Sequence, residues 1–199
     1  MSNSFINRKD RIIASAIENI SEAGLASLST KTLAMKENMS ESLLYRYFGG
    51  IEEVLVEVVN TFTKFDKVLI ATIEAKDITH LEKVVEFLNT LGTYYDGYKE
   101  LGAIVLNYED FLHNVNTRET IAGCIQMRTD FGRRELKASM EEGEIINTFT
   151  PEELSDIFFG SLVRDLLNRR IQYDKKTHDE FTKTILDKLV KMLRTDKNL

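Results

Sequence analysis

The stretch from Leu28 to Phe48, LSTKTLAMKENMSESLLYRYF, constrains the fold most, because it predicts two short helices joined by a tight turn. Ser29 and Ser40 are expected to cap these helices, since a serine hydroxyl at that position accepts a hydrogen bond from a free backbone N–H. Asn38 lies between the helices and tolerates the left-handed conformation that commonly ends a helix. Each cap is flanked by two apolar residues at the spacing of a hydrophobic staple, Leu28 with Leu33 and Met39 with Leu44.

The second predicted helix has one apolar face and one mixed face. Leu44 and Phe48 lie four residues apart and are expected to point inward, which leaves outward Glu41, Ser42, Leu43, Tyr45 and Arg46. Small hydroxyls, a tyrosine and an arginine at a helix start suit contacts with phosphates and base edges. Thr32 and Leu43 stand where a full capping box would carry Glu or Gln, so no capping box is predicted. An ordinary αα-hairpin has the same spacing, so the pattern alone leaves both interpretations open.

Further residues around this stretch follow a known pattern. The most specific are the run Leu44-Tyr45-Arg46-Tyr47-Phe48 and the later run Glu52-Glu53-Val54-Leu55. They are joined by Ile13, Ala16, Gly24, Ser29, Leu33, Ala34, Met39 and Ser40. With these residues, the segment from about Ile6 to Asp66 resembles the N-terminal domain of the tetracycline-repressor-like (TetR) family of bacterial transcriptional regulators.

The resemblance implies a helix-turn-helix DNA-binding domain over residues 6–66, with its motif at residues 29–48. The second helix of the motif would enter the major groove. Contacts with phosphates are then expected from Ser29, Thr30, Lys31, Ser40, Tyr45 and Tyr47, and contacts with bases from Glu41, Ser42, Leu43 and Arg46. Three positions depart from the family pattern: Asn38 and Ser42 stand where glycine is common, and Ile51 stands where a phosphate-binding lysine is usual.

Charge and composition bound the class of protein. The chain has 199 residues, 43% apolar and 29% charged, which is typical of a globular protein with a sizeable core. The net charge is −6, but residues 1–50 have a balance of +1, so the acidic excess lies in the remainder. An acidic body with a near-neutral head suits a regulator that does not bind DNA indiscriminately, but any acidic cytosolic protein could show the same balance. No stretch approaches ~18 apolar residues, and the N-terminus lacks a signal-like apolar segment, so a cytoplasmic protein without a membrane partner is expected.

The rest of the chain predicts helices throughout. The chain has a single proline, Pro151, and lacks long alternating β-branched runs, which predicts an all-α fold. The expected helices begin near Arg8, span the motif, and continue over residues 51–75, 79–95, 101–113, 117–142, 150–173 and 177–193. The helix over 117–142 is expected to break or weaken near Gly123 and Gly132 and to end at Gly143. A three-helix helix-turn-helix head is thus joined by the long helix 51–75 to a C-terminal helical bundle, residues 67–199.

The last two helices carry more apolar surface than one bundle partner requires. Burial within one chain would explain this, and so would dimerisation. In the resembled family the last two helices pair with those of a second copy, so a homodimer is preferred. Its interface is predicted at Phe158, Leu162, Leu166, Phe181, Ile185 and Leu189.

Aromatic side chains are concentrated in the middle of the chain. Each could simply fill the core, but buried tyrosines need polar partners, and an apolar cavity with a few hydroxyls is typical of a small-molecule site. Because the resembled family binds effectors in its C-terminal bundle, an unidentified small-molecule effector is expected there. The predicted pocket residues are Phe62, Phe65, Tyr94, Tyr95, Tyr98, Tyr108, Phe111, Met127 and Phe131.

Other chemistry finds little support in the sequence. Cys124 is alone, so neither a disulfide nor a cysteine-based metal site is expected within one chain. Glu109 and His113 have the spacing of two metal ligands, but no third ligand lies nearby. His80 and His178 are expected to be exposed. No phosphate loop, nucleophile elbow or catalytic triad order occurs, so no enzymatic activity and no cofactor are predicted.

Together these observations predict a ligand-responsive transcriptional regulator, most simply a repressor that binds a palindromic double-stranded operator as a dimer. The alternative is a helical protein–protein interaction module that does not bind DNA. The isoleucine at position 51 and the weak basic charge keep this alternative open.

Overall fold

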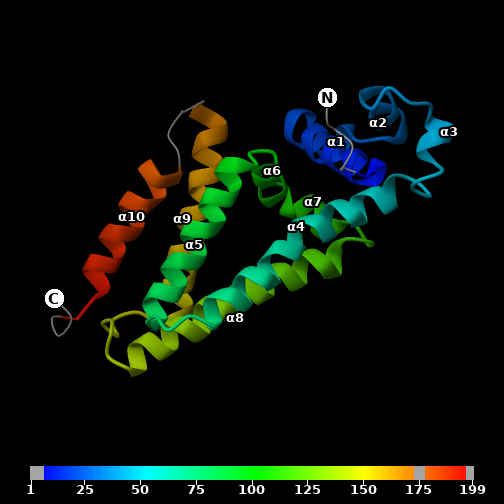
Figure 1. Cartoon of the computed structure of the whole chain (residues 1–199). Helices are drawn as coiled ribbons and strands as arrows, with labels where there is room; N and C mark the ends of the chain where they lie inside the picture. The colour runs from blue at the N-terminus through cyan, green and yellow to red at the C-terminus, as the bar shows by residue number, and fades with distance from the viewer. Residues whose placement is uncertain (1–6, 173–177, 196–199) are drawn as a thin grey trace. The chain divides into compact units, whose positions relative to one another are not determined.

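In the computed structural model, residues 7–172 and 178–195 are described, and regular secondary structure among them is helical (Figure 1). This confirms the all-α prediction. The chain folds into two compact units, and each is described by itself. Among the described residues, the first unit comprises 7–65 and 99–123, and the second comprises 66–98, 124–172 and 178–195. Among the described residues, no helix is both long and apolar enough to cross a membrane.

The first unit contains the motif and the helices packed against it. Its elements are α1 (Arg8–Ala23), the 3₁₀ turn Leu25–Ser27, α2 (Thr30–Lys36), α3 (Glu41–Leu44), α6 (Leu101–Leu106), α7 (Tyr108–His113), and the first parts of α4 (Ile51–Glu74) and α8 (Arg118–Glu141). Helix α1 packs against both α2 and α6, and α2 packs against α3. The buried side chains Ile12, Ala16 and Ile20 form one face of α1, so this helix is the support on which the motif rests.

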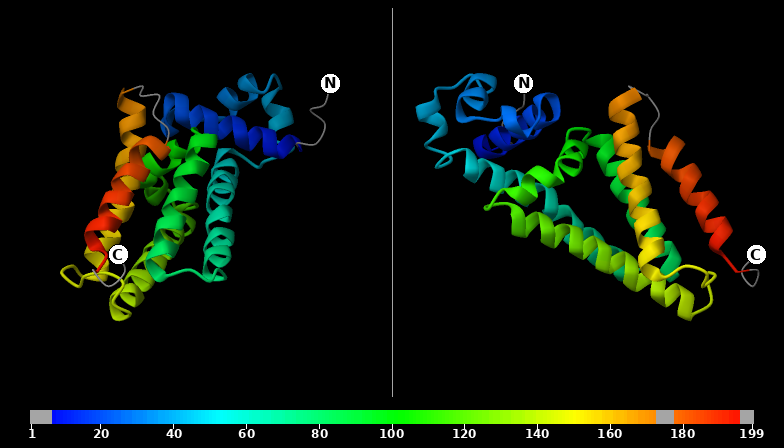
Figure 2. Two further views of the ribbon diagram at one scale, coloured as in Figure 1. Left: turned by 60° about the vertical axis from the view of Figure 1, so that its left-hand side comes forward. Right: turned by 180° about the vertical axis from the view of Figure 1, so that it is seen from behind.

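The second unit is built around three helices that lie side by side (Figures 1 and 2). These are α5 (His80–Gly97), α9 (Pro151–Gln172) and α10 (His178–Leu193), and each packs against the other two. The remaining parts of α4 and α8 complete the unit. An aromatic cluster fills part of its core: the Phe87 ring lies 5.0 Å from the Phe131 ring and 5.9 Å from the Phe159 ring, between centroids.

Several helix boundaries lie close to the predicted ones. Thr79 caps α5 and forms a capping box with Glu82. Thr150 and Glu153 exchange the same pair of bonds at the start of α9, with Pro151 as the first helical residue. After α8, Gly143 adopts a positive φ of 74°, a conformation that glycine accommodates without strain.

Two predicted helices differ from the structure. The helix expected over residues 101–113 is divided into α6 and α7 at Asn107, whose backbone leaves helical geometry and whose side chain donates to the carbonyl of Ala103. The glycines at 123 and 132 do not interrupt α8. A Cβ at Gly132 would approach the Phe159 ring to 2.5 Å, so the glycine permits close packing of α8 against α9.

The division into units also differs from the predicted domains 6–66 and 67–199. The first switch between units, after Phe65, lies close to the predicted boundary. Residues 99–123, however, belong to the first unit, although the sequence placed them in the C-terminal domain. The packing of α6 against α1 accounts for this, because it joins two segments that are far apart in the chain.

Candidate nucleic-acid interface

The first helix of the motif is fixed at its start by two side chains. The Ser29 hydroxyl accepts from the Thr32 backbone N–H at 3.1 Å, as predicted. The Thr32 hydroxyl in turn accepts from the Ser29 backbone N–H at 2.9 Å. The prediction that this helix lacks a capping box was therefore wrong, since a threonine hydroxyl performs the role expected of Glu or Gln.

The second helix begins as predicted but is much shorter. Asn38 has a φ of 51°, and Ser40 caps α3 by accepting from the Leu43 backbone N–H at 3.2 Å. Regular α-helix then covers only Glu41–Leu44. The backbone N–H groups of Arg46 and Tyr47 donate to carbonyls three residues back, which tightens the chain into turns before it reaches Gly49.

This short segment nevertheless separates inward from outward side chains as predicted, except at Leu43, which was expected outward and is half-buried. Leu44 and Phe48 are 0% and 1% exposed, so they anchor the segment in the first unit. Glu41, Ser42, Tyr45 and Arg46 are exposed, and Tyr45 retains 52% of its accessible surface. Leu43 and Tyr47 are half-buried, as are Ser29 and Thr30 of α2, whereas Lys31 and Ser40 are exposed.

The basic residues of this region fall into two classes. Arg11 and Lys36 are paired with carboxylates: Arg11 with Glu37 at 3.0 Å, and Lys36 with Glu18 and Glu22 at 3.1 and 2.9 Å. Burial lowers the pKa of Lys36, but the hydrogen bonds to Glu22 and Glu18 together outweigh this effect, so the pKa is raised above its usual value. Within the described part of the chain, Lys31 and Arg46 form no ion pair with a carboxylate. Both side chains are exposed, so they can bind an external anion without first losing an internal partner.

Two polar contacts organise the hydroxyls and the carboxylate at the start of α3. The Thr30 hydroxyl donates to Glu41 Oε2 at 3.0 Å and so connects the first turns of α2 and α3. The Ser40 and Ser42 hydroxyls lie 2.9 Å apart. The Thr30 hydroxyl is thus held by a carboxylate and the Ser40 and Ser42 hydroxyls by each other, while Ser40 and Ser42 remain exposed.

The start of α4 and the packing around it add features that the sequence prediction missed. Glu53 accepts from the Gly49 backbone N–H at 2.6 Å, and Glu52 accepts from the side chains of Asn114 and Asn116. These amide donors lower the pKa of Glu52. Lys9 of α1 lies over the Phe48 ring, 5.0 Å from its centroid, so tertiary packing places a further cation beside the motif.

The nine predicted pocket residues are distributed over both units. Phe62, Phe65, Tyr108 and Phe111 belong to the first unit, and Tyr94, Tyr95, Tyr98, Met127 and Phe131 belong to the second. In the first unit, Phe62 and Tyr108 form an edge-to-face pair 6.0 Å apart. In the second, the Tyr94 ring lies 6.0 Å from that of Tyr95 and 5.2 Å from that of Tyr98, which is mostly exposed.

Tyr95 belongs to a buried polar cluster that spacing could not reveal. Arg128 donates to Asp66 from its ε nitrogen, at 3.0 Å from Oδ2, and from a terminal nitrogen, at 2.9 Å from Oδ2 and 3.0 Å from Oδ1. The same terminal nitrogen lies 3.0 Å from the Tyr95 hydroxyl. The Cys124 thiol donates to Asp66 at 2.8 Å. Asp66 is fully buried and Arg128 nearly so. Burial raises the pKa of both Tyr95 and Cys124 to about 12, so the thiol is protonated and unreactive near neutral pH.

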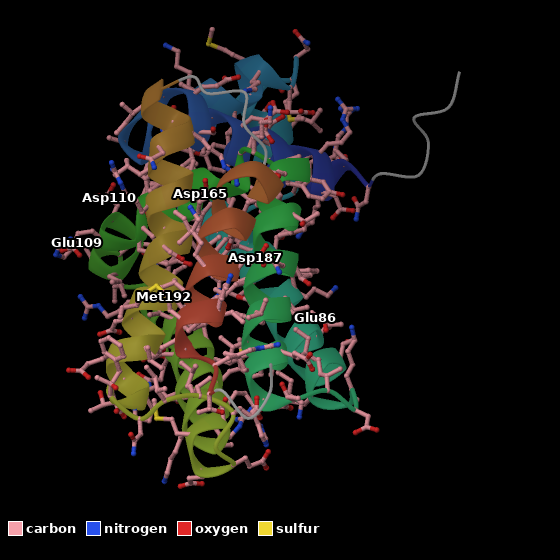
Figure 3. All side chains as sticks on the ribbon, turned by 90° about the vertical axis from the view of Figure 1, so that its left-hand side faces the viewer. Glu86, Glu109, Asp110, Asp165, Asp187 and Met192 are labelled. Carbon is pink, nitrogen blue, oxygen red and sulfur yellow. The ribbon has the colours of Figure 1, made fainter. Side chains whose placement is uncertain are left out.

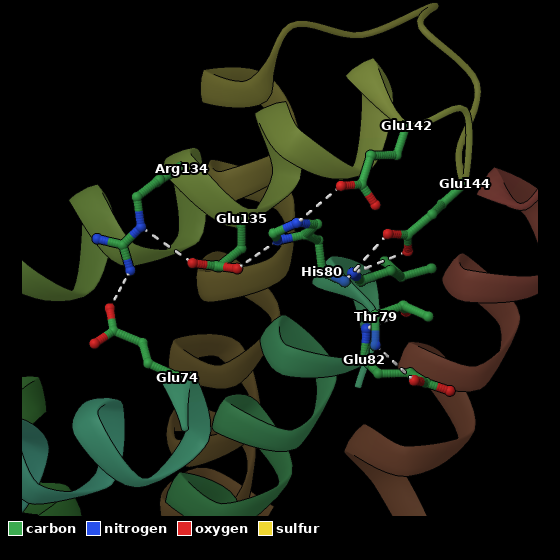
Figure 4. A network of polar contacts seen from close by, with 9 residues as sticks. Glu74, Thr79, His80, Glu82, Arg134, Glu135, Glu142 and Glu144 are labelled. Atoms are coloured by element: carbon green, nitrogen blue, oxygen red, sulfur yellow. Dashed lines mark hydrogen bonds and ion pairs between the residues drawn. The ribbon is translucent and has the colours of Figure 1, made fainter. Parts of the chain in front are cut away.

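A second polar network surrounds the start of α5 (Figure 4). His80, expected to be exposed, is half-buried, and its ring nitrogens face Glu135 at 2.7 Å and Glu142 at 3.4 Å. Glu144 accepts from the backbone N–H groups of His80 and Leu81, which satisfies the start of the helix. Arg134 joins Glu135 to Glu74, so this network fastens α4, α5 and α8 within the second unit.

The predicted dimer residues on α9 are core residues of the chain. Phe158, Leu162 and Leu166 are buried in the second unit, and Ile185 and Leu189 of α10 are half-buried. The side chain of Phe181 lies outside the described residues. The exposed apolar residues of α9 occupy another face, at Ile157, Val163, Leu167 and Ile171. On α10, Met192 is 74% exposed (Figure 3).

The candidate metal ligands remain on the surface. His113 and Glu109 of α7 approach to 3.5 Å, but both are largely exposed, and Glu109 extends from the outer side of its helix (Figure 3). Among the described residues, no group of three metal-ligating side chains is found. The structure therefore brings the predicted pair together without building a site around it.

Comparisons with known proteins agree with this geometry. Residues 12–58, which contain the whole motif, match the family described as bacterial regulatory proteins, tetR family. The ketosteroid transcriptional regulator KstR2 of Mycobacterium tuberculosis has a similar structure, with a TM-score of 0.83 at 14% identity over 98% of both chains. The regulator PfmR from Thermus thermophilus gives a TM-score of 0.78 at 18% identity, over 94% of this chain and 100% of that one.

A third similar structure is the transcriptional regulator FadR from Bacillus subtilis, solved in complex with stearoyl-CoA. It gives a TM-score of 0.73 at 18% identity, over 92% of this chain and 97% of that one. A search of curated protein sequences found no match. At these identities the solved structures establish the fold, and they do so over nearly the whole chain.

Proposed function

We propose that this chain, whose residues 12–58 match the family described as bacterial regulatory proteins, tetR family, represses transcription by binding operator DNA. The observation that carries the proposal is the state of Lys31 and Arg46. Both are exposed within the motif and lack a carboxylate partner among the described residues, whereas the nearby Arg11 and Lys36 have one. Unpaired cations on a helix-turn-helix surface are available to phosphates and bases.

In the proposed complex, the start of α3 lies in the major groove. Arg46 and the exposed residues of α3 face base edges, and Lys31 at the start of α2 contacts the phosphate backbone. Phosphate contacts release bound counterions, so affinity falls with rising salt. With few unpaired cations on the motif, we expect contacts with ~4–8 phosphates per dimer. The salt slope, which is the slope of log affinity against log salt concentration, should therefore be modest.

The protein is proposed to act as a homodimer on a palindromic operator. The support is the group of exposed apolar residues on α9, at Ile157, Val163, Leu167 and Ile171, because apolar side chains gathered on one exposed face of a helix favour a partner surface. Two motifs related by two-fold symmetry would meet half-sites about 34 Å, or one helical turn, apart.

The dimer has a direct test. The double variant Val163→Glu and Leu167→Glu places charges on the proposed interface, and sedimentation is expected to show a folded monomer with unchanged helix content. Lys137→Glu, at an exposed position on α8, is the matched control and should leave the dimer intact. A wild-type protein that stays monomeric at roughly tens of micromolar would refute the proposal.

We further propose that a small, largely apolar effector binds the second unit and weakens DNA binding. FadR from Bacillus subtilis was solved with stearoyl-CoA, and here the second unit carries Tyr94, Tyr95 and Tyr98 with their rings close together. Helix α4 is continuous from the first unit into the second, so it can transmit a displacement. A coupling of ~1–3 kcal/mol would change operator affinity roughly 5–150-fold.

A selection of genomic fragments with the purified protein tests the proposed function. We expect enrichment of palindromic fragments, and Arg46→Ala should change the enriched sequence, because this residue faces the bases. If no fragment is enriched over bulk DNA, the protein is instead a helical interaction module. Once an effector is found, calorimetry should show that operator DNA lowers the affinity for the effector by the same factor as the effector lowers the affinity for operator DNA.

A further inference from the structure

We propose that Glu41 determines operator specificity by accepting a hydrogen bond from a base amino group, and that it selects cytosine at one position of each half-site. The inference rests on the proposed function and names what one side chain recognises. Glu41 is exposed at the first position of α3, the end of the helix expected to meet the bases.

The position of the carboxylate is set from outside its own helix. Thr30, the first residue of α2, donates its hydroxyl to Glu41 Oε2 at 3.0 Å. Thr30 is itself half-buried and follows Ser29, whose capping box with Thr32 fixes the start of α2. Glu41 therefore begins α3 with one carboxylate oxygen held by a neighbouring helix, which lowers the entropic cost of binding with the other oxygen.

That other oxygen, Oε1, accepts no hydrogen bond within the described part of the chain. A carboxylate accepts hydrogen bonds and donates none, so it cannot bind the phosphate backbone or the acceptor atoms of guanine and thymine. In the major groove only the amino groups of cytosine and adenine donate. Adenine places its N7 acceptor beside that amino group, opposite the carboxylate lone pairs, whereas the cytosine amino group is the usual partner of Glu.

The same carboxylate lowers the affinity for DNA that offers it no amino group at this position. Phosphates repel it, and a base edge that offers only acceptors leaves it desolvated without a partner. Glu41 thus contributes discrimination, while Lys31 and Arg46 contribute attraction. Removing the carboxylate should therefore strengthen binding to unrelated DNA and weaken the preference for the operator.

Variants of the full chain at Glu41 test the proposal by selection from random DNA and by titration of matched duplexes. In the wild type, one position of each half-site should be cytosine, and other bases there should lower affinity about 5- to 150-fold. Glu41→Gln should change the preference at that position to adenine, because an amide pairs with adenine N6 and N7. Glu41→Ala should lose the preference there alone and bind unrelated DNA more tightly.

Thr30 is a positioning residue in this scheme. Thr30→Val should reduce discrimination at the same base position. Thr30→Ser should leave the discrimination as in the wild type, because serine keeps the hydroxyl. A general loss of structure would instead lower affinity for all sequences and would change the melting curve. Circular dichroism of each variant separates these two effects.

The outcomes distinguish this inference from the proposed function. If the wild type selects a sequence and both Glu41→Gln and Glu41→Ala select the same one, Glu41 does not determine specificity and the inference is overturned. If the wild type selects no sequence at all, the proposed function fails and the inference falls with it.

Discussion

The motif surface of the first unit and the polar cluster of the second unit use the same kinds of side chain in opposite ways. In the cluster, Arg128 and Asp66 are buried and satisfy each other with hydrogen bonds. On the motif, Arg46 and Lys31 are exposed and lack a carboxylate partner among the described residues. Charge alone therefore does not mark a functional surface in this protein. The state of its hydrogen bonds separates the residues that hold the fold from those available to another molecule.

The largest effect should come from breaking the buried pair. Arg128→Met leaves the Asp66 carboxylate buried without its cation, which costs about 3–5 kcal/mol. Thermal unfolding followed by circular dichroism should show a much lower Tm. The matched control is Lys137→Met on the same helix, because its ion pair with Glu141 is exposed and contributes under about 1 kcal/mol. Equal changes in Tm for the two variants would contradict a structural role for the buried pair.

A second effect should appear only in alkaline solution. The folded-state pKa of Cys124 and of Tyr95 is raised to about 12, above the unfolded values of 9.0 for the thiol and 10.0 for the phenol. The unfolded chain therefore releases these protons first. Titration of these two groups should leave stability unaffected below about pH 9 and should lower it between about pH 9 and 12, by up to about 1.4 kcal/mol per pH unit for each group.

The Tm of the wild type and of Cys124→Ala, measured from about pH 7 to 11, checks this prediction. Without the thiol, the decline that begins near pH 9 should be delayed toward pH 10, where the phenol starts to titrate in the unfolded chain. Identical pH profiles for the two proteins would show that Cys124 does not contribute to the alkaline loss of stability.

A smaller effect is expected at the helix cap that supports the motif. Ser29→Ala removes the side-chain half of the capping box and should destabilise the first unit by about 1 kcal/mol. Ser42→Ala is the matched control on the exposed face, where the expected change is within about 0.5 kcal/mol. Unfolding in urea measures both, and a Ser29→Ala midpoint no lower than that of Ser42→Ala would contradict the prediction.

The smallest change in stability, with a clear change in DNA binding, should come from Lys31. Lys31→Ala should alter stability by under about 0.5 kcal/mol. It should also weaken binding to all sequences alike and reduce the salt slope by about 1 for each half-site. Lys36→Ala on the same helix is the control, because Lys36 is paired with Glu18 and Glu22 and should leave the slope unchanged. Equal salt slopes for the two variants would show that pairing with a carboxylate does not determine which lysine contacts DNA.

Local signals in the sequence predicted local structure well. The caps at Ser29 and Ser40, the turn at Asn38, and the inward positions of Leu44 and Phe48 depend on neighbours within a few residues, and the structure confirms them. The DNA contacts assigned to the motif residues remain predictions. The exposure of six of them is consistent with such contacts but does not test them: Lys31, Ser40, Glu41, Ser42, Tyr45 and Arg46.

Features that depend on distant residues could not be predicted in this way. Asp66 and Arg128 lie 62 residues apart, and no pattern within either helix indicates that they meet. Helix α9 carries apolar residues on two faces, so its sequence did not reveal that Phe158, Leu162 and Leu166 face the chain's own core. Only the packing of α9 against α5 and α10 decides which face is left exposed.

The shortness of α3 has a consequence for how proteins with this architecture diverge. Four residues cannot sustain a helix by themselves, so the segment persists because its cap and its two anchors, Leu44 and Phe48, hold it. The side chains at positions 41, 42, 45 and 46 are exposed and contribute little to that support. After gene duplication, one copy could therefore change what this surface recognises through a few substitutions there, while its fold was inherited unchanged.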